Sequence, residues 1–91
     1  MAIYAIRYTY VSDTEALAAV RPKHREFLKS LFDDGVLLAS GPLEGNRALI
    51  IVEADDAVAA LALVDADPFN QASLITDREA LEWTQVYGPW A

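Results

Sequence analysis

The chain has 91 residues, 54% of them hydrophobic, no cysteine, and a formal net charge of −7 from 14 acidic and 7 basic residues. A chain of this length and apolar content is one globular domain, residues 1–91, rather than a disordered segment. The absence of cysteine excludes disulfides and thiolate metal sites, one histidine cannot form a multi-histidine site, and we expect no metal. The negative charge argues against nucleic acid and anionic membranes as partners.

The N-terminal stretch MAIYAIRYTY predicts a strand over residues 2–10, because it is rich in β-branched and aromatic residues that partly alternate. It has no charged leader before an apolar core, unlike a signal peptide. No apolar run reaches the roughly 20 residues of a membrane span. We therefore expect a cytoplasmic protein without a membrane partner. The two faces of the strand would carry Ile3, Ala5, Arg7 and Thr9 on one side and Tyr4, Ile6, Tyr8 and Tyr10 on the other.

Two helices are predicted next. Ser12 and Glu15 have the spacing of a capping box, with Ser12 as the N-cap. Pro22 fits the first turn of a helix but not its middle, and it disfavours helical angles at the preceding residue. The sequence therefore predicts a short helix over 13–20 and a second helix from Pro22 to about residue 34, ended by Gly35.

The second half of the chain predicts two more strands, a helix and a last strand. Residues 36–43 and 47–54 are β-rich and are separated by Glu44-Gly45-Asn46, which favours a hairpin. Asp55 and Asp56 suit the positive end of a helix that continues to residue 64. A short irregular or helical piece, 68–74, follows. Residues 79–87 alternate and predict the fourth strand, with Leu81, Trp83, Gln85 and Tyr87 on one side.

This order of elements is that of an α+β, ferredoxin-like split βαββαβ fold. It places a four-stranded antiparallel sheet against helices on one face only. The chain holds more apolar residues than one buried face requires. We therefore expect a homodimer that packs sheet against sheet.

The only histidine, His24, would share a helix face with Arg21, Leu28 and Leu31, so it is expected to be at least half buried. A half-buried imidazole needs a hydrogen-bond partner. It is either a structural histidine or one half of an acid–base pair. A neighbouring carboxylate would hold one imidazole tautomer and favour the protonated ring, which suits proton transfer near neutral pH.

Asp67, in the stretch DADPF, is the best placed carboxylate, and its own pattern has two interpretations. An aspartate before a proline is a good N-cap, with Pro68 at the first helical position. The same carboxylate is also a candidate partner for His24.

A cluster of basic residues also has two interpretations. It is either a solvated helix face or a positive field that attracts an anionic ligand. Its members are Arg21, Lys23, Arg25 and Lys29.

Three segments together resemble the signature of the YciI-like, or YCII-related, domain family. They are VRPKH at 20–24, GVLLASGP at 35–42 and DADPF at 65–69, in the same order and spread over the chain. Each is weak alone, and the three in order are more specific. The resemblance implies a ferredoxin-like fold within the dimeric α+β barrels. It also implies that His24 and Asp67 are the family's proposed catalytic pair, that Ser40 lies near the same cleft, and that Arg21 belongs to the motif.

The resemblance does not define one reaction. One branch of the family acts as a dehydrochlorinase on a chlorinated hydroxyquinol, and the wider superfamily includes muconolactone isomerases and cofactor-free oxygenases. Many relatives have a longer loop after the Gly-Pro step than residues 43–46 here. The pocket would then be more open, or closed by a dimer partner or by the C-terminal GPWA, which includes Trp90.

We therefore expect a cofactor-free enzyme that acts on a small, anionic or aromatic molecule by elimination, isomerisation or hydrolysis. His24 would be the acid or base, Asp67 would orient it, and Arg21 would hold an anionic group. Ser40 would bond the substrate, and Phe69 and Trp83 would line the pocket. The alternative is a non-catalytic module that binds a small ligand or a protein. An oxygenase rests on analogy of fold alone.

Overall fold

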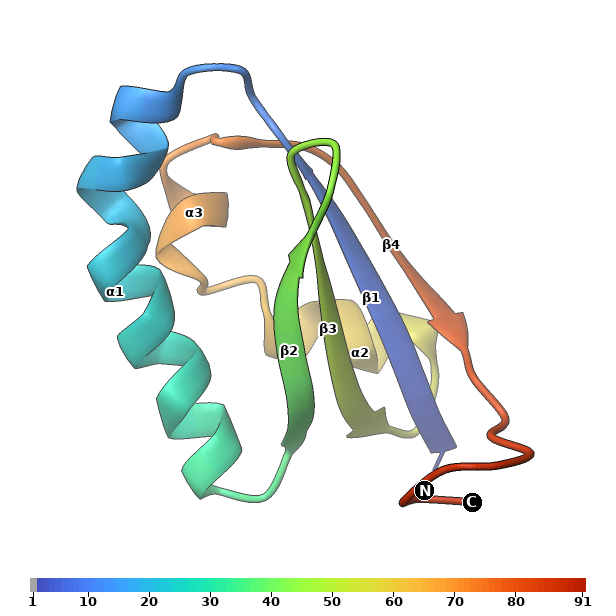
Figure 1. Cartoon of the computed structure of the whole chain (residues 1–91). Helices are drawn as coiled ribbons and strands as arrows, with labels where there is room; N and C mark the ends of the chain where they lie inside the picture. The colour runs from blue at the N-terminus through green and yellow to red at the C-terminus, as the bar shows by residue number, and fades with distance from the viewer. Residues whose placement is uncertain (1) are drawn as a thin grey trace.

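A computed structural model describes residues 2–91 (Figure 1). Strands and helices alternate along it as the ferredoxin-like pattern requires, with one additional short helix before the last strand. The elements are β1 (Ala2–Tyr10), α1 (Thr14–Asp33), β2 (Leu37–Leu43), β3 (Arg47–Ala54), α2 (Ala57–Leu63), α3 (Pro68–Gln71) and β4 (Ile75–Glu82). No helix within these residues is both long and apolar enough to cross a bilayer.

The four strands form one antiparallel sheet in the order β2-β3-β1-β4. β1 is therefore a central strand that pairs with both β3 and β4, and β2 is an edge strand next to α1. Figure 1 shows the helices together on one side of this sheet. The predicted α+β, ferredoxin-like architecture is confirmed.

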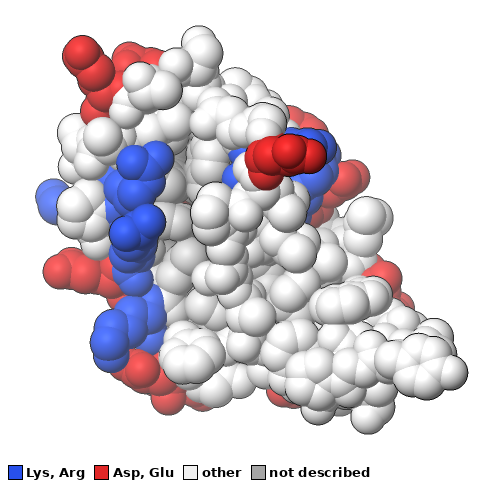
Figure 2. Space-filling view, in the orientation of Figure 1, with Lys and Arg blue, Asp and Glu red and all other residues white. Residues whose placement is uncertain are grey.

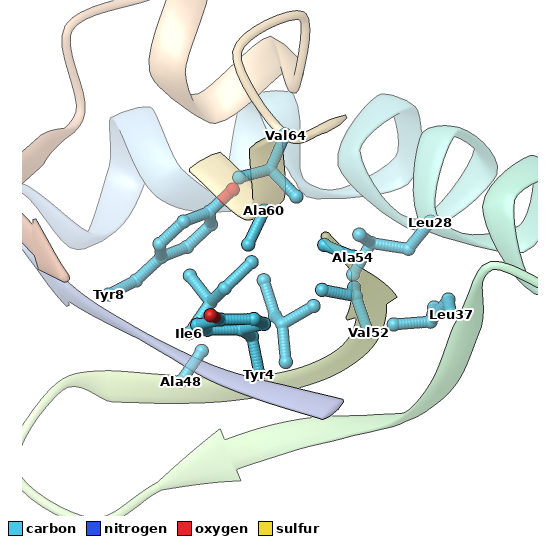
Figure 3. Close-up of a cluster of buried hydrophobic side chains, with 11 residues drawn as sticks. Tyr4, Ile6, Tyr8, Leu28, Leu37, Ala48, Val52, Ala54, Ala60 and Val64 are labelled. Atoms are coloured by element: carbon cyan, nitrogen blue, oxygen red, sulfur yellow. The ribbon is translucent and has the colours of Figure 1, made fainter. Parts of the chain in front are cut away.

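The hydrophobic core lies between the sheet and the helices. The alternation predicted for β1 is confirmed, because Tyr4, Ile6 and Tyr8 are buried while their neighbours on the opposite face are partly exposed. These side chains pack against Ala60 of α2 and Val64, the C-cap residue of that helix (Figure 3). The buried stripe of α1 consists of Leu17, His24 and Leu28, of which Leu28 belongs to this core cluster. His24 therefore lies in the buried stripe, as predicted.

The first helix differs from its prediction. α1 runs without interruption through Pro22, and its N-cap is Asp13, whose side chain accepts a hydrogen bond from the Ala16 amide. Proline deletes the bond to the carbonyl four residues earlier, here that of Ala18, which lies on the exposed side of the helix where solvent can bond it. Leu17 and Leu28, on either side of Pro22, are both buried, so packing holds the two halves in one helix.

The last strand also differs from its prediction, since β4 is Ile75–Glu82 rather than 79–87. It pairs with β1 from Tyr10 opposite Ile75 to Tyr4 opposite Glu82. One further bond follows, from the Trp83 amide to the Ile3 carbonyl at 2.9 Å, and among the described residues the pairing with β1 goes no further. The hairpin is correct, with β2 and β3 at the predicted positions to within one residue.

Candidate active site

His24 and Asp67 form a buried pair although 43 residues separate them along the chain. His24 Nδ1 lies 2.8 Å from Oδ2 and 2.9 Å from Oδ1 of Asp67. Asp67 has 0% exposure and His24 has 8%. α1 supplies the histidine from its buried stripe, and the N-cap residue of α3 supplies the carboxylate. The predicted proximity of the two side chains is therefore what the structure shows.

The carboxylate of Asp67 accepts hydrogen bonds from three donors. Besides the imidazole, the hydroxyl of Tyr8 donates to Oδ2 at 3.0 Å and the backbone amide of Phe69 donates to Oδ1 at 2.9 Å. The last bond caps α3, where Pro68 occupies the first turn. The two interpretations of Asp67, helix cap and histidine partner, thus hold at the same time. Three donors compensate the cost of burying this charge.

The pairing determines which nitrogen of His24 can react. An ionised carboxylate only accepts hydrogen bonds, so Nδ1 is the donor and the neutral ring carries its free lone pair on Nε2. Nε2 has no hydrogen-bond partner among residues 2–91, and no fully buried side-chain nitrogen or oxygen there lacks one. Nε2 is therefore reached from outside. The imidazole also stacks on the Phe69 ring, with centroids 4.2 Å apart and planes 24° apart, which fixes its orientation.

His24 lines a pocket of about 390 Å³ between α1, α3 and the β2–β3 hairpin. This size is within the range of small-molecule sites. The structure brings Arg21, Ser40 and Phe69 to the same pocket, as predicted, while Asp67 lies behind the imidazole and does not line it. Arg25, a member of the basic cluster seen in the sequence, also lines it, and sequence reasoning missed Tyr10 and Arg47 among the other lining residues. Figure 2 shows basic side chains in a row along α1, on the surface turned toward the viewer.

Trp83 does not join this set, contrary to the expected pocket lining. Its backbone amide bonds to the carbonyl of Ile3, near the start of β1, whereas the pocket lies near Tyr10 at the other end of that strand. Its ring packs edge-on against Trp90, with centroids 6.4 Å apart. Neither tryptophan lines the pocket. The tryptophans therefore hold the C-terminal segment at the opposite end of the sheet.

Two tyrosines border the pair as protonated phenols. Burial raises the pKa of Tyr8, and the negative charge and hydrogen bond of Asp67 raise it further. Burial raises the pKa of Tyr10 to about 12, the charge of Asp67 adds to this, and Arg21 opposes it. Tyr8 was also missed from the sequence, although a tyrosine on a buried strand face needs a partner for its hydroxyl. Among the described residues, no group of three or more histidine or acidic side chains is placed to hold a metal ion.

Comparison with solved structures agrees with this fold. The chain superposes on 5-chloro-2-hydroxyhydroquinone dehydrochlorinase from Burkholderia phenoliruptrix AC1100, in complex with 2,5-dihydroxybenzoquinone, with a TM-score of 0.77 and 18% identity over 90% of this chain and 93% of that one. A putative antibiotic biosynthesis monooxygenase from Nitrosomonas europaea gives a TM-score of 0.56 and 13% identity, over 96% of this chain and 100% of that one.

The family follows from the sequence comparison rather than from these superpositions. No curated protein matches the sequence. A family model, that of the YCII-related domain, matches residues 1–84, which is nearly the whole chain. The motifs at 20–24, 35–42 and 65–69 all lie within the matched range. The chain therefore belongs to the YCII-related domain family.

Proposed function

We propose that this protein is a cofactor-free enzyme that moves protons on a small, anionic or aromatic molecule. One observation carries the proposal: His24 lines a pocket and has no partner on Nε2 among the described residues, while Nδ1 is held by a fully buried carboxylate. A histidine that served only the structure would have no need of a free nitrogen toward a cavity. This arrangement suits general acid–base catalysis, because Asp67 orients the ring and stabilises the imidazolium that forms.

In an elimination, Nε2 takes a proton from a carbon of the substrate. The electron pair of the broken C–H bond forms a carbon–carbon double bond, and the leaving group departs from the adjacent carbon with the electrons of its own bond. In an isomerisation, the imidazolium returns the proton to another carbon of the same molecule. In a hydrolysis, Nε2 takes the proton from an attacking water and gives it to the leaving group.

Other pocket residues would bind and orient the substrate. Ser40 has an exposed hydroxyl in the pocket that can donate or accept a hydrogen bond. The guanidinium of Arg21 suits a carboxylate or another planar anion. The rings of Phe69 and Tyr10, which meet edge-on at 5.1 Å, form an apolar wall for a flat molecule. The ligand of the structurally similar dehydrochlorinase, 2,5-dihydroxybenzoquinone, is of this kind and is a reasonable first probe.

The proposal is tested by turnover of a panel of small chlorinated hydroxyquinols and unsaturated lactones, followed as chloride release or as a change in absorbance. His24→Gln should lower the rate of any reaction found by about 10²- to 10⁴-fold. Lys23→Gln is the matched control, because Lys23 is an exposed neighbour on α1 that does not line the pocket. Binding of ligands without turnover of any of them would instead favour a non-catalytic binding module.

The homodimer expected from the sequence is part of the proposal. The sheet face without helices carries apolar side chains, including Leu81, which is 58% exposed. Leu81 stands opposite Ala5, another residue of that face. Light scattering on the wild type and on Leu81→Asp measures the oligomeric state directly. We expect a dimer for the wild type and a weaker dimer for the variant.

A further inference from the structure

The arginines of this chain fall into two groups. Arg7 makes ion pairs with Asp77 and Glu79, both at 3.0 Å, and Arg78 pairs with Asp65. Within residues 2–91, the other three arginines make no ion pair with a carboxylate, and all three line the pocket of His24. They are Arg21, Arg25 and Arg47. In a chain with twice as many acidic as basic residues, leaving these three without partners around one pocket is unexpected for a merely solvated surface.

Arg21 and Arg25 are four residues apart on α1, so they lie on one face of the helix, beside the buried stripe that holds His24. Lys29 continues the row and is paired with Asp33 at 2.7 Å. Figure 2 shows this row of basic side chains along α1, on the surface turned toward the viewer. Arg47 reaches the same pocket from the start of β3, and its Nε atom donates to the carbonyl of Glu44 at 3.1 Å, which leaves its terminal nitrogens available.

No aspartate or glutamate lines the pocket. The nearest buried acid behind it is Asp67, whose single negative charge is already bonded to three donors. With His24 neutral, three guanidinium groups against one carboxylate leave two positive charges uncompensated at the site. Apart from the polar Ser40 and Asn46, the remaining walls are mainly apolar or aromatic and include Phe69, Tyr10, Leu28 and Ile50.

We propose that the ligand of this pocket is a small planar molecule that carries two negative charges, with Arg21 and Arg25 as its specificity-determining residues. Its ring would lie against the aromatic wall beside His24, and its acidic groups would reach the arginines. A guanidinium binds a carboxylate through two parallel hydrogen bonds, which sets direction as well as charge. The inference rests on the proposed function only in that both use the same pocket.

The test compares benzoate with phthalate, isophthalate and terephthalate, and adds hydroquinone as a neutral ring, in isothermal titration calorimetry at constant ionic strength. At least one dicarboxylate should bind about tenfold more tightly than benzoate, and hydroquinone should bind more weakly than either. Arg25→Gln and Arg21→Gln should each weaken dicarboxylate binding by about tenfold or more. Lys23→Gln removes the same charge from the same helix outside the pocket and should change binding by less than about twofold.

Three results would overturn the inference. They are equal affinity for benzoate and all dicarboxylates, equal losses in Lys23→Gln and Arg25→Gln, and no dicarboxylate binding tighter than about 1 mM. Failure of the proposed function gives a different result. Tight dicarboxylate binding that survives in His24→Gln, with no turnover of any compound, would support the dianion site and contradict the catalytic role. Turnover of neutral phenols without dicarboxylate binding would support the catalytic role and contradict the dianion site.

Discussion

Asp56 and Asp67 do the same local task in very different surroundings. Asp56 caps α2, and its exposed side chain accepts one hydrogen bond, from the Ala59 amide at 2.7 Å. Asp67 caps α3 through the Phe69 amide, but its carboxylate is completely buried and also accepts from His24 and Tyr8. A helix cap requires only one acceptor and no burial.

The difference between the two caps shows what belongs to the site. Burying a carboxylate is costly unless donors surround it, and a surface cap such as Asp56 avoids this cost. The chain nevertheless places Asp67 in the interior and provides a histidine and a tyrosine for it from two other elements, α1 and β1. We interpret the extra burial and donors as the structural requirement for holding His24 with one nitrogen toward the pocket.

The largest effect on stability is expected when the Asp67 carboxylate is removed, and removal of the Asp56 carboxylate is the comparison. Asp67→Ala leaves the donors of His24 and Tyr8 buried without an acceptor and should lower the free energy of unfolding by about 3–5 kcal/mol. Asp56→Ala loses only a surface cap, which is worth about 1 kcal/mol. Chemical denaturation of both variants measures the contrast. Equal losses would mean that Asp67 is no more than a cap.

A smaller effect is expected from Tyr8→Phe, which removes one donor and keeps the ring in the core. We expect a loss of about 2 kcal/mol, since the deleted bond is to a buried charge. The pKa of Tyr8 is raised in the folded protein, so above a pH of about 10 the unfolded chain loses this proton while the folded protein keeps it, and stability falls as pH rises.

Tyr8→Phe should therefore also flatten the alkaline decrease in the free energy of unfolding. Part of the decrease should remain, because the pKa of Tyr10 is itself raised to about 12. Denaturation between neutral and alkaline pH measures both slopes. An unchanged slope in the variant would show that the Tyr8 hydroxyl is not buried against Asp67.

The smallest effect on stability is expected from Asp67→Asn. The amide oxygen can accept from Phe69 and His24 as Oδ1 does now, and the amide nitrogen can donate to the Tyr8 oxygen. The charge is lost and the Tyr8 hydroxyl exchanges an acceptor for a donor, which together should cost about 1 kcal/mol. Turnover of any substrate identified should nevertheless fall by at least about tenfold, since the imidazolium loses its stabilising charge. Full activity in this variant would contradict the role of Asp67.

Most of the fold could be predicted because periodicity and turn chemistry are local. β1, the hairpin and the buried position of His24 follow from alternation and helical spacing. The interruption at Pro22 was wrong because the burial of Leu17 and Leu28 on either side of it outweighs the lost hydrogen bond of one proline. The length of β4 was wrong because it is determined by the register with β1, a long-range property.

Most of the site residues that could be predicted lie in or next to the motif segments. His24, Asp67, Arg21, Ser40 and Phe69 lie in or next to the motif segments, and the structure places them together. Arg25 lies next to a motif segment too, but only its membership of a basic cluster pointed to it, whereas Tyr8 and Arg47 lie near the site only through the sheet, which no short segment encodes. Trp83 was misplaced together with β4. From the sequence, the role of Asp67 as a helix cap and its role as the partner of His24 were alternatives. The sequence does not show that one carboxylate accepts hydrogen bonds from three donors at once.

The most direct measurement is a long-range proton–nitrogen NMR correlation of the imidazole at alkaline pH, where imidazole is neutral. The chain has a single histidine, so the ring signals need no assignment. We expect the proton on Nδ1 and an unprotonated Nε2, and we expect only the Nε2 environment to respond strongly when a ligand enters the pocket. A proton on Nε2 would contradict the central claim, because that nitrogen could then not accept a proton from a substrate.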